Sequence, residues 1–126
     1  MSAPPRRILL VEDNETIRHA FGILLEESGY EVVQAANGAD ALARARADAP
    51  DLVLMDLGLP DLNGLEVTRR IKGDPATRNI VVVALTGRAL ETDAAASLAA
   101  GCDGYLSKPI DSEQLLRRIP EFLMGS

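Results

Sequence analysis

Acidic, hydroxyl and amine side chains follow short apolar runs at four places in the chain. Glu12 and Asp13 follow one run, Asp56 a second, Thr86 a third and Lys108 a fourth. Three carboxylates gathered at one place repel one another, by about 4 kcal/mol for two unit charges roughly 4 Å apart at an effective dielectric near 20. A divalent cation would offset this repulsion. Oxygen ligands with room for water favour Mg²⁺, with Mn²⁺ as the alternative.

The chemistry available to such a cluster is transfer of a phosphoryl group to a carboxylate. The cation and Lys108 together would hold Asp56 ionised and shield an incoming phosphoryl group, so that the carboxylate becomes a nucleophile toward phosphorus. The hydroxyl of Thr86 could then donate a hydrogen bond to a phosphoryl oxygen. This chemistry requires that the four apolar runs end at the same point in space.

Short apolar runs bounded by polar residues are typical of buried parallel strands. Four such runs cover residues 8–11, 52–55, 80–85 and, more weakly, 104–106. A fifth candidate strand, 31–35, is less apolar and suits an edge of the sheet.

Helical spacing fills the intervals between these runs. We expect helices that end at Gly29, that span 38–48, that run from Asn63 to 73–75, that lie near 91–100, and that start at 111 or 112. The last helix should end or kink near Pro120. Alternating strands and helices predict an α/β fold, with a parallel sheet covered on both faces. Ligands of such sheets bind outside the carboxyl ends of the central strands, where the polar residues converge.

Size and composition indicate one folded domain. The chain has 126 residues, of which 47% are hydrophobic and 25% charged. We expect a tail at 1–6, a domain at 7–124 and no output domain. The net charge of -6 argues against direct contact with nucleic acid or anionic membranes. A single cysteine, Cys102, and the lack of a leader or membrane span favour the cytoplasm.

Five short motifs in order resemble those of the receiver domains of two-component response regulators. They are VEDN at 11–14, LMDLGLP at 54–60, NG at 63–64, ALTG at 84–87 and KP at 108–109, and the resemblance covers residues 7–119. It implies a flavodoxin-like, doubly wound, five-stranded parallel sheet of order 2-1-3-4-5 with five helices. It also implies a single-domain response regulator, not an enzyme, which assists only its own phosphorylation and dephosphorylation. The phosphoryl donor would be a histidine kinase or a histidine phosphotransfer protein, and the signal would pass to an unknown downstream protein.

The same resemblance assigns the metal site and the phosphoacceptor. Asp56 would accept the phosphoryl group. The metal would be held by Asp13, Asp56 and the backbone carbonyl of Gly58, with Glu12 reaching it through a water molecule.

The resemblance also implies which positions change conformation on phosphorylation and which set the lifetime of the phosphoryl group. Thr86 and Lys108 would sense the phosphoryl group, and Tyr105 would be the aromatic residue that turns inward when Thr86 moves. Gly58 would leave the site open to water while Arg88 partly covers it. The bond between Lys108 and Pro109 is expected to be cis.

Each of these side chains also has a plainer interpretation. Asp13 and Thr86 could be helix caps, Glu12 could be a solvated turn residue, and Lys108 could be surface charge. Tyr105 could hold its hydroxyl at the rim of the core. These side chains form one functional site only if they lie close together in the fold.

Three other classes of protein compete with this hypothesis. An aspartyl phosphatase or phosphomutase needs a second acid two residues after the nucleophile, where this chain has Gly58. A receiver-like binding module that is never phosphorylated would lack Asp56, Lys108 or the acidic pair. A flavin or nucleotide carrier needs a glycine-rich loop after the first strand, where this chain has the acidic segment EDNE at 12–15.

Overall fold

The structure is a computed structural model that describes residues 6–86 and 100–124. Its elements in chain order are β1 (Arg7–Val11), α1 (Glu15–Glu27), β2 (Glu31–Ala35), α2 (Gly38–Asp48), β3 (Leu52–Asp56), α3 (Gly64–Gly73), β4 (Val81–Thr86), β5 (Gly104–Ser107) and α5 (Ser112–Met124). The predicted helix near 91–100 lies almost entirely outside the described residues, which therefore contain four of the five expected helices.

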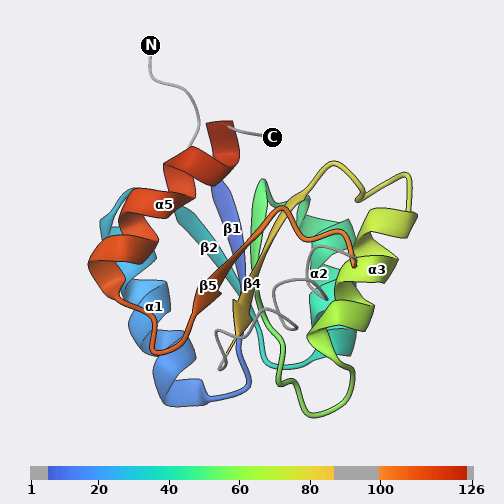
Figure 1. Cartoon of the computed structure of the whole chain (residues 1–126), viewed down its shortest axis with the longest axis horizontal. Helices are drawn as coiled ribbons and strands as arrows, with labels where there is room; N and C mark the ends of the chain where they lie inside the picture. Colours follow the sequence, from blue (N-terminus) through green and yellow to red (C-terminus); the bar gives the residue numbers. More distant parts are fainter. Residues whose placement is uncertain (1–5, 87–99, 125–126) are drawn as a thin grey trace.

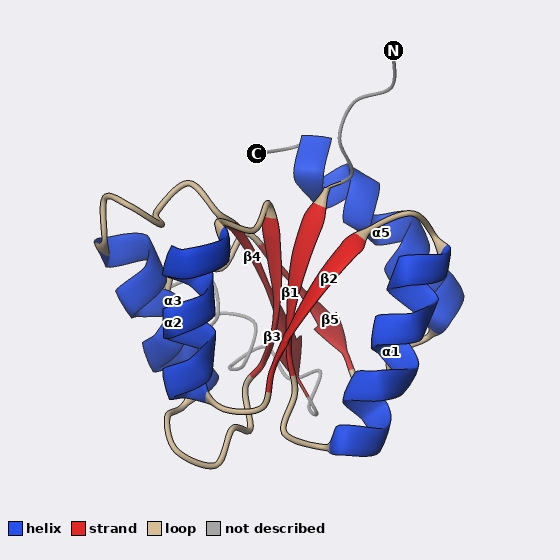
Figure 2. Ribbon diagram, turned by 180° about the vertical axis from the view of Figure 1, so that it is seen from behind, coloured by secondary structure: helices blue, strands red, loops and turns tan. Residues whose placement is uncertain are grey.

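The five strands form one parallel sheet in the order β2-β1-β3-β4-β5. This order confirms the prediction, including the edge position of β2. Helices α1 and α5 cover one face of the sheet, and α2 and α3 cover the other (Figures 1 and 2).

Side chains of the central strands alternate between two apolar layers. Leu9, Val53 and Met55 belong to the cluster beneath α2 and α3, whereas Leu10 and Leu54 belong to the cluster beneath α1 and α5. All five are fully buried. Burial on both faces explains why these strands are continuous apolar runs rather than alternating patterns.

Helix α5 does not end near Pro120, which was one of the two outcomes expected there, an end or a kink. The helix continues to Met124 with the proline inside it. Beyond the proline, Phe122 and Leu123 pack against the apolar cluster beneath α1 and α5. Partial burial of these two side chains helps to offset the backbone hydrogen bond that a proline removes.

None of the helices in residues 6–86 and 100–124 combines the length and apolar character that a membrane span requires.

Candidate functional site

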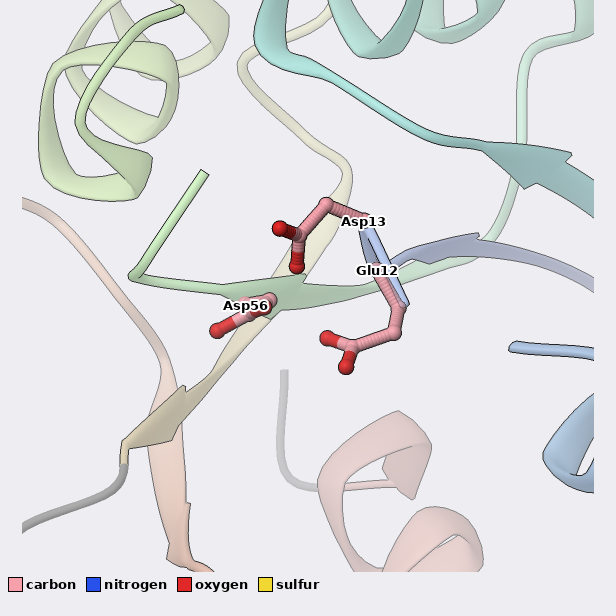
Figure 3. Close-up of side chains that lie close together, drawn as sticks. All are labelled: Glu12, Asp13 and Asp56. Atoms are coloured by element: carbon pink, nitrogen blue, oxygen red, sulfur yellow. The ribbon is translucent and has the colours of Figure 1, made fainter. Parts of the chain in front are cut away.

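The carboxyl ends of β1 and β3 bring three acidic side chains together. The two strands are neighbours in the sheet, with Val11 opposite Met55. Glu12 and Asp13 directly follow β1, and Asp56 is the last residue of β3, so the three side chains lie side by side (Figure 3). Each offers a carboxylate oxygen, and these oxygens lie within 4.8 Å of one another.

Lys108 reaches this acidic cluster from the loop that follows β5. Its Nζ atom lies 3.0 Å from Oδ1 of Asp56 and 3.7 Å from Oε2 of Glu12. The backbone N–H of Lys108 donates to the carbonyl of Thr86 at 2.7 Å, which fixes the loop beside the end of β4. The peptide bond between Lys108 and Pro109 is cis, as predicted. The predicted convergence of acids and amine is therefore present.

The cluster has a buried floor and an exposed mouth. Glu12 and Asp56 are 3% and 4% exposed, whereas Asp13 is exposed to solvent. Gly58 is also exposed, and its N–H donates to Oδ1 of Asp56 at 3.0 Å. A phosphoryl donor or a hydrated cation would thus approach from the side of Asp13 and Gly58.

Burial and neighbouring charges move the pKa values of the two buried acids in opposite directions. Burial and, after it, the adjacent Asp56 carboxylate together raise the pKa of Glu12 to about 8, although Lys108 partly offsets the increase. Burial alone would also raise the pKa of Asp56. Hydrogen bonds from Glu12, the Gly58 N–H and Lys108 outweigh it, and the pKa of Asp56 is lowered. Asp56 is the acid that stays ionised and available as a nucleophile.

The residues of the cluster fit a divalent cation. Oε2 of Glu12 is buried without a hydrogen-bond partner among the described residues, because Lys108 Nζ at 3.7 Å is too distant to donate to it. Such an orphaned oxygen is costly unless a cation or its water supplies the missing interaction. Carboxylate oxygens are hard ligands of the kind that Mg²⁺ and Mn²⁺ prefer.

The other predicted site residues, Thr86, Tyr105, Arg88 and Gly58, differ in burial and position. Thr86 ends β4 and is 3% exposed, close to the backbone of Lys108. Tyr105 lies on β5 opposite Ala84 and is 40% exposed, so its ring is not in the core. Arg88 lies outside the described residues. A Cβ atom at Gly58 would lie 3.8 Å from Oδ1 of Asp56, an ordinary contact, so a side chain would fit there.

One contact at the site was not predicted from the sequence. The Nη1 atom of Arg18 donates to the backbone carbonyl of Glu12 at 2.8 Å, and its Nε donates to Oε1 of Gln34 at 3.2 Å. Arg18 thus ties the turn that carries the acidic pair to both α1 and β2. An arginine on an amphipathic helix is typically solvated, and only the fold reveals this partner.

Comparison with known proteins agrees with the fold and the acidic cluster. A family model described as the response regulator receiver domain matches residues 8–120. The chain belongs to this family, and it has the size of a single receiver domain. It is therefore a receiver protein of two-component signalling, a class whose members generally act as regulatory phosphoacceptors.

Individual relatives match along nearly their whole length. The polar-differentiation response regulator DivK of Brucella anthropi is 42% identical over 119 residues, which is 94% of this chain and 97% of that protein. A CheY-like receiver domain protein from Methanospirillum hungatei has a TM-score of 0.89 at 33% identity, covering 96% of this chain and 95% of that one. The receiver domain of a sensor histidine kinase from Pseudomonas aeruginosa has a TM-score of 0.87 at 36% identity, covering 97% and 99%, and holds a magnesium ion in its active-site cleft.

Proposed function

We propose that Asp56 accepts a phosphoryl group from the phosphohistidine of a histidine kinase or a histidine phosphotransfer protein. The P–N bond of the donor breaks as a P–O bond forms to the Asp56 carboxylate, and the imidazole leaves with the electron pair. The observation that carries this proposal is the 3.0 Å contact between Lys108 Nζ and Asp56 Oδ1 inside a cluster of three acids. The amine holds the acceptor ionised and is placed to stabilise charge on the transferred group.

The metal in this proposal is Mg²⁺, which Mn²⁺ can replace. Asp13, Asp56 and the Gly58 carbonyl would hold it, with Glu12 reaching it through a water molecule. The cation would neutralise the charge that gathers between the carboxylates and the phosphoryl oxygens. The orphaned Oε2 of Glu12 supports this assignment, as does the magnesium ion held by the related Pseudomonas domain.

Phosphorylation would be read out through Thr86 and Tyr105. Thr86 is buried next to Lys108, where its hydroxyl can donate to a phosphoryl oxygen after a small movement. Tyr105 is exposed on β5 and can turn toward the space that Thr86 leaves. The altered surface would then bind a downstream protein. Gly58 and Arg88 would set how quickly water removes the phosphoryl group, and Arg88→Ala should change the lifetime of the phosphorylated protein.

Residues 7–124 would act as one receiver domain. The chain would assist only its own phosphorylation and dephosphorylation. A cytoplasmic location is also part of the proposal, supported by the free, buried thiol of Cys102.

Intact-mass measurement tests the central step. Wild-type protein incubated with acetyl phosphate and Mg²⁺ should gain the mass of one phosphoryl group. Asp56→Asn should gain none, and chelation of the metal should abolish the gain in the wild type. A wild-type protein that stays unmodified, or an Asp56→Asn variant that is modified equally, would overturn the assignment.

A further inference from the structure

Asp61 forms a bridge between the loop that carries Gly58 and the first turn of α2. The loop spans residues 57–63 between β3 and α3. Within it, Oδ1 of Asp61 accepts from the Gly38 N–H at 2.7 Å, and Oδ2 accepts from the Ala39 N–H at 3.0 Å. Both carboxylate oxygens are thus used on two consecutive backbone donors more than twenty residues away. These donors would otherwise lack intrahelical partners.

Two glycines allow this loop to pack closely against its supports. A Cβ atom at Gly38 would lie 2.8 Å from Cβ of Leu62. A Cβ atom at Gly64 would lie 2.5 Å from the carbonyl oxygen of Asp56. The loop therefore packs closely against α2 at Leu62, next to Asp61. Gly64, the residue after the loop, packs closely against the end of β3. Gly58 lies in the part of the loop between the end of β3 and Asp61.

The turn before α2 also supports the other side of the acidic cluster. The backbone N–H of Glu12 donates to the carbonyl of Ala35, the last residue of β2, at 3.1 Å. Gly38 and Ala39 follow a few residues later. The segment 35–39 therefore forms hydrogen bonds with Glu12 at its first residue and with Asp61 at its last two. It is a common support for the turn after β1 and the loop after β3.

Electrostatics favour the ionised form of Asp61 in this bridge. Hydrogen bonds from the Gly38 and Ala39 backbone lower the pKa of its carboxyl group. The carboxylate also lies at the N-terminal end of α2, where the helix dipole favours negative charge. In the described residues the clustered acids are Glu12, Asp13 and Asp56, and Asp61 is not among them. Asp61 is therefore not one of the acids that would bind a metal directly, and its hydrogen bonds connect it to the site through the loop.

We propose that Asp61 is a positioning residue, which fixes the loop at 57–63 so that the Gly58 carbonyl faces the divalent cation. This inference rests on the proposed function, because it assumes that the acidic cluster binds a metal. Groups that orient the ligands of a metal typically change its affinity by about 10- to 100-fold when they are removed. We expect loss of the Asp61 carboxylate to weaken metal binding by a factor in this range.

Metal affinity measured without any phosphorylation provides the first test. Binding of Mn²⁺ to Asp61→Ala, followed by electron paramagnetic resonance, should weaken by about tenfold or more relative to the wild type. In phosphorylation by acetyl phosphate, the metal concentration for half-maximal rate should rise by a similar factor. The rate at saturating metal should stay close to that of the wild type. This separation of affinity from maximal rate is not expected from a general loss of structure.

Asp40→Asn serves as the matched control. It removes one negative charge from the first turn of α2, where Asp40 pairs with Arg44. The bonds that Asp61 accepts come from the backbone of Gly38 and Ala39, not from the side chain of Asp40. The variant should keep Mn²⁺ affinity within about twofold of the wild type, well short of the effect expected for an orienting group.

The outcomes separate the two proposals. If wild-type protein fails to bind Mn²⁺, the proposed function falls. If the wild type binds but Asp61→Ala binds equally well, or if Asp40→Asn reproduces its loss, only the role of Asp61 is overturned. If Asp61→Ala does not fold by circular dichroism, Asp61→Asn decides. Its amide keeps one accepting oxygen, so an intermediate loss supports the bridge and an unchanged affinity contradicts it.

Discussion

The amine of Lys108 contacts the carboxylate of Asp56 at 3.0 Å, although 52 residues separate the two in the sequence. The same amine lies 3.7 Å from Glu12, so it faces both buried acids. The positive charge of Lys108 is therefore in place before any phosphoryl group arrives. A preorganised charge of this kind needs no rearrangement at the moment of transfer, which is why it can lower the barrier effectively.

Replacing Lys108 should impair phosphorylation without preventing metal binding. In Lys108→Ala, Asp56 and the incoming group lose a fixed positive charge, so the rate with acetyl phosphate at saturating Mg²⁺ should fall on the order of 100-fold. Lys108→Arg keeps the charge in a different shape and should fall less. Initial rates from intact mass would measure both. A wild-type rate for Lys108→Ala would show that the contact has no catalytic role.

The raised pKa of Glu12 predicts a pH-dependent stability in the absence of divalent cations. Between its ordinary value of 4.5 and about 8, the folded protein binds a proton at Glu12 that the unfolded chain has released. The free energy of unfolding should therefore decrease as pH rises through this window, on the order of 1 kcal/mol per pH unit. Asp56 has a lowered pKa, so its contribution is lost only in acid.

Glu12→Gln isolates this effect, because the amide does not titrate. Urea unfolding of wild type between about pH 6 and pH 8 should show midpoints that fall with pH, and the variant should show a flatter dependence. Equal slopes for the two proteins would contradict the assignment of the proton to Glu12.

The convergence of the site was predictable because it follows from the fold class. Apolar runs identified β1, β3 and β4, and parallel strands necessarily end at one edge of the sheet. Asp56 and Lys108 could therefore be placed together from the sequence. Helix α2 also has the predicted bounds, Gly38–Asp48, because a cap at one end and Pro50 beyond the other define it.

Features that depend on packing could not be predicted in the same way. Pro120 indicated a helix end or a kink, but α5 continues to Met124, and Phe122 beyond the proline packs against the core. Arg18 and Asp61 are typical of solvent-exposed positions in a helix and a turn. Their partners, the Glu12 carbonyl and the start of α2, are brought near only by tertiary contacts.

Tyr105 should become less accessible on phosphorylation. The chain has two tyrosines and no tryptophan, so Tyr30→Phe leaves Tyr105 as the only strong emitter. Its ring is 40% exposed in this structure, and quenching of its fluorescence by acrylamide should decrease when acetyl phosphate and Mg²⁺ are added. Adding Asp56→Asn to the same background is the control and should abolish the change. Unaltered quenching in a phosphorylated sample would exclude an inward turn.

Asp13 should have opposite effects on stability with and without Mg²⁺. Without metal, its charge adds to the repulsion within the cluster, where Asp56 is ionised, so Asp13→Asn should unfold at a slightly higher temperature than wild type. With Mg²⁺ at about 100 times its dissociation constant, binding should stabilise the wild type by about 2.7 kcal/mol. Asp13→Asn should be stabilised much less by the same concentration of Mg²⁺, because it lacks one of the proposed metal ligands. Calorimetry with and without Mg²⁺ should therefore show the order of the two proteins reversing, and an equal gain would remove Asp13 from the metal site.

The two glycines at the ends of α3 should respond very differently to alanine. A Cβ atom at Gly64 would lie 2.5 Å from the Asp56 carbonyl oxygen and 2.8 Å from Cα of Leu57, and neither backbone atom can rotate away. Gly64→Ala should therefore lower the free energy of unfolding by about 1–3 kcal/mol. Because the strain falls on the backbone of Asp56, the phosphoacceptor, the substitution should also slow phosphorylation by acetyl phosphate.

Gly73 at the other end of the helix is the control. A Cβ atom at Gly73 would meet nothing within 4 Å, so Gly73→Ala should be neutral or stabilising by up to about 1 kcal/mol. Urea unfolding followed by circular dichroism compares the two, and similar stabilities would mean that the end of β3 can move away from α3 without loss.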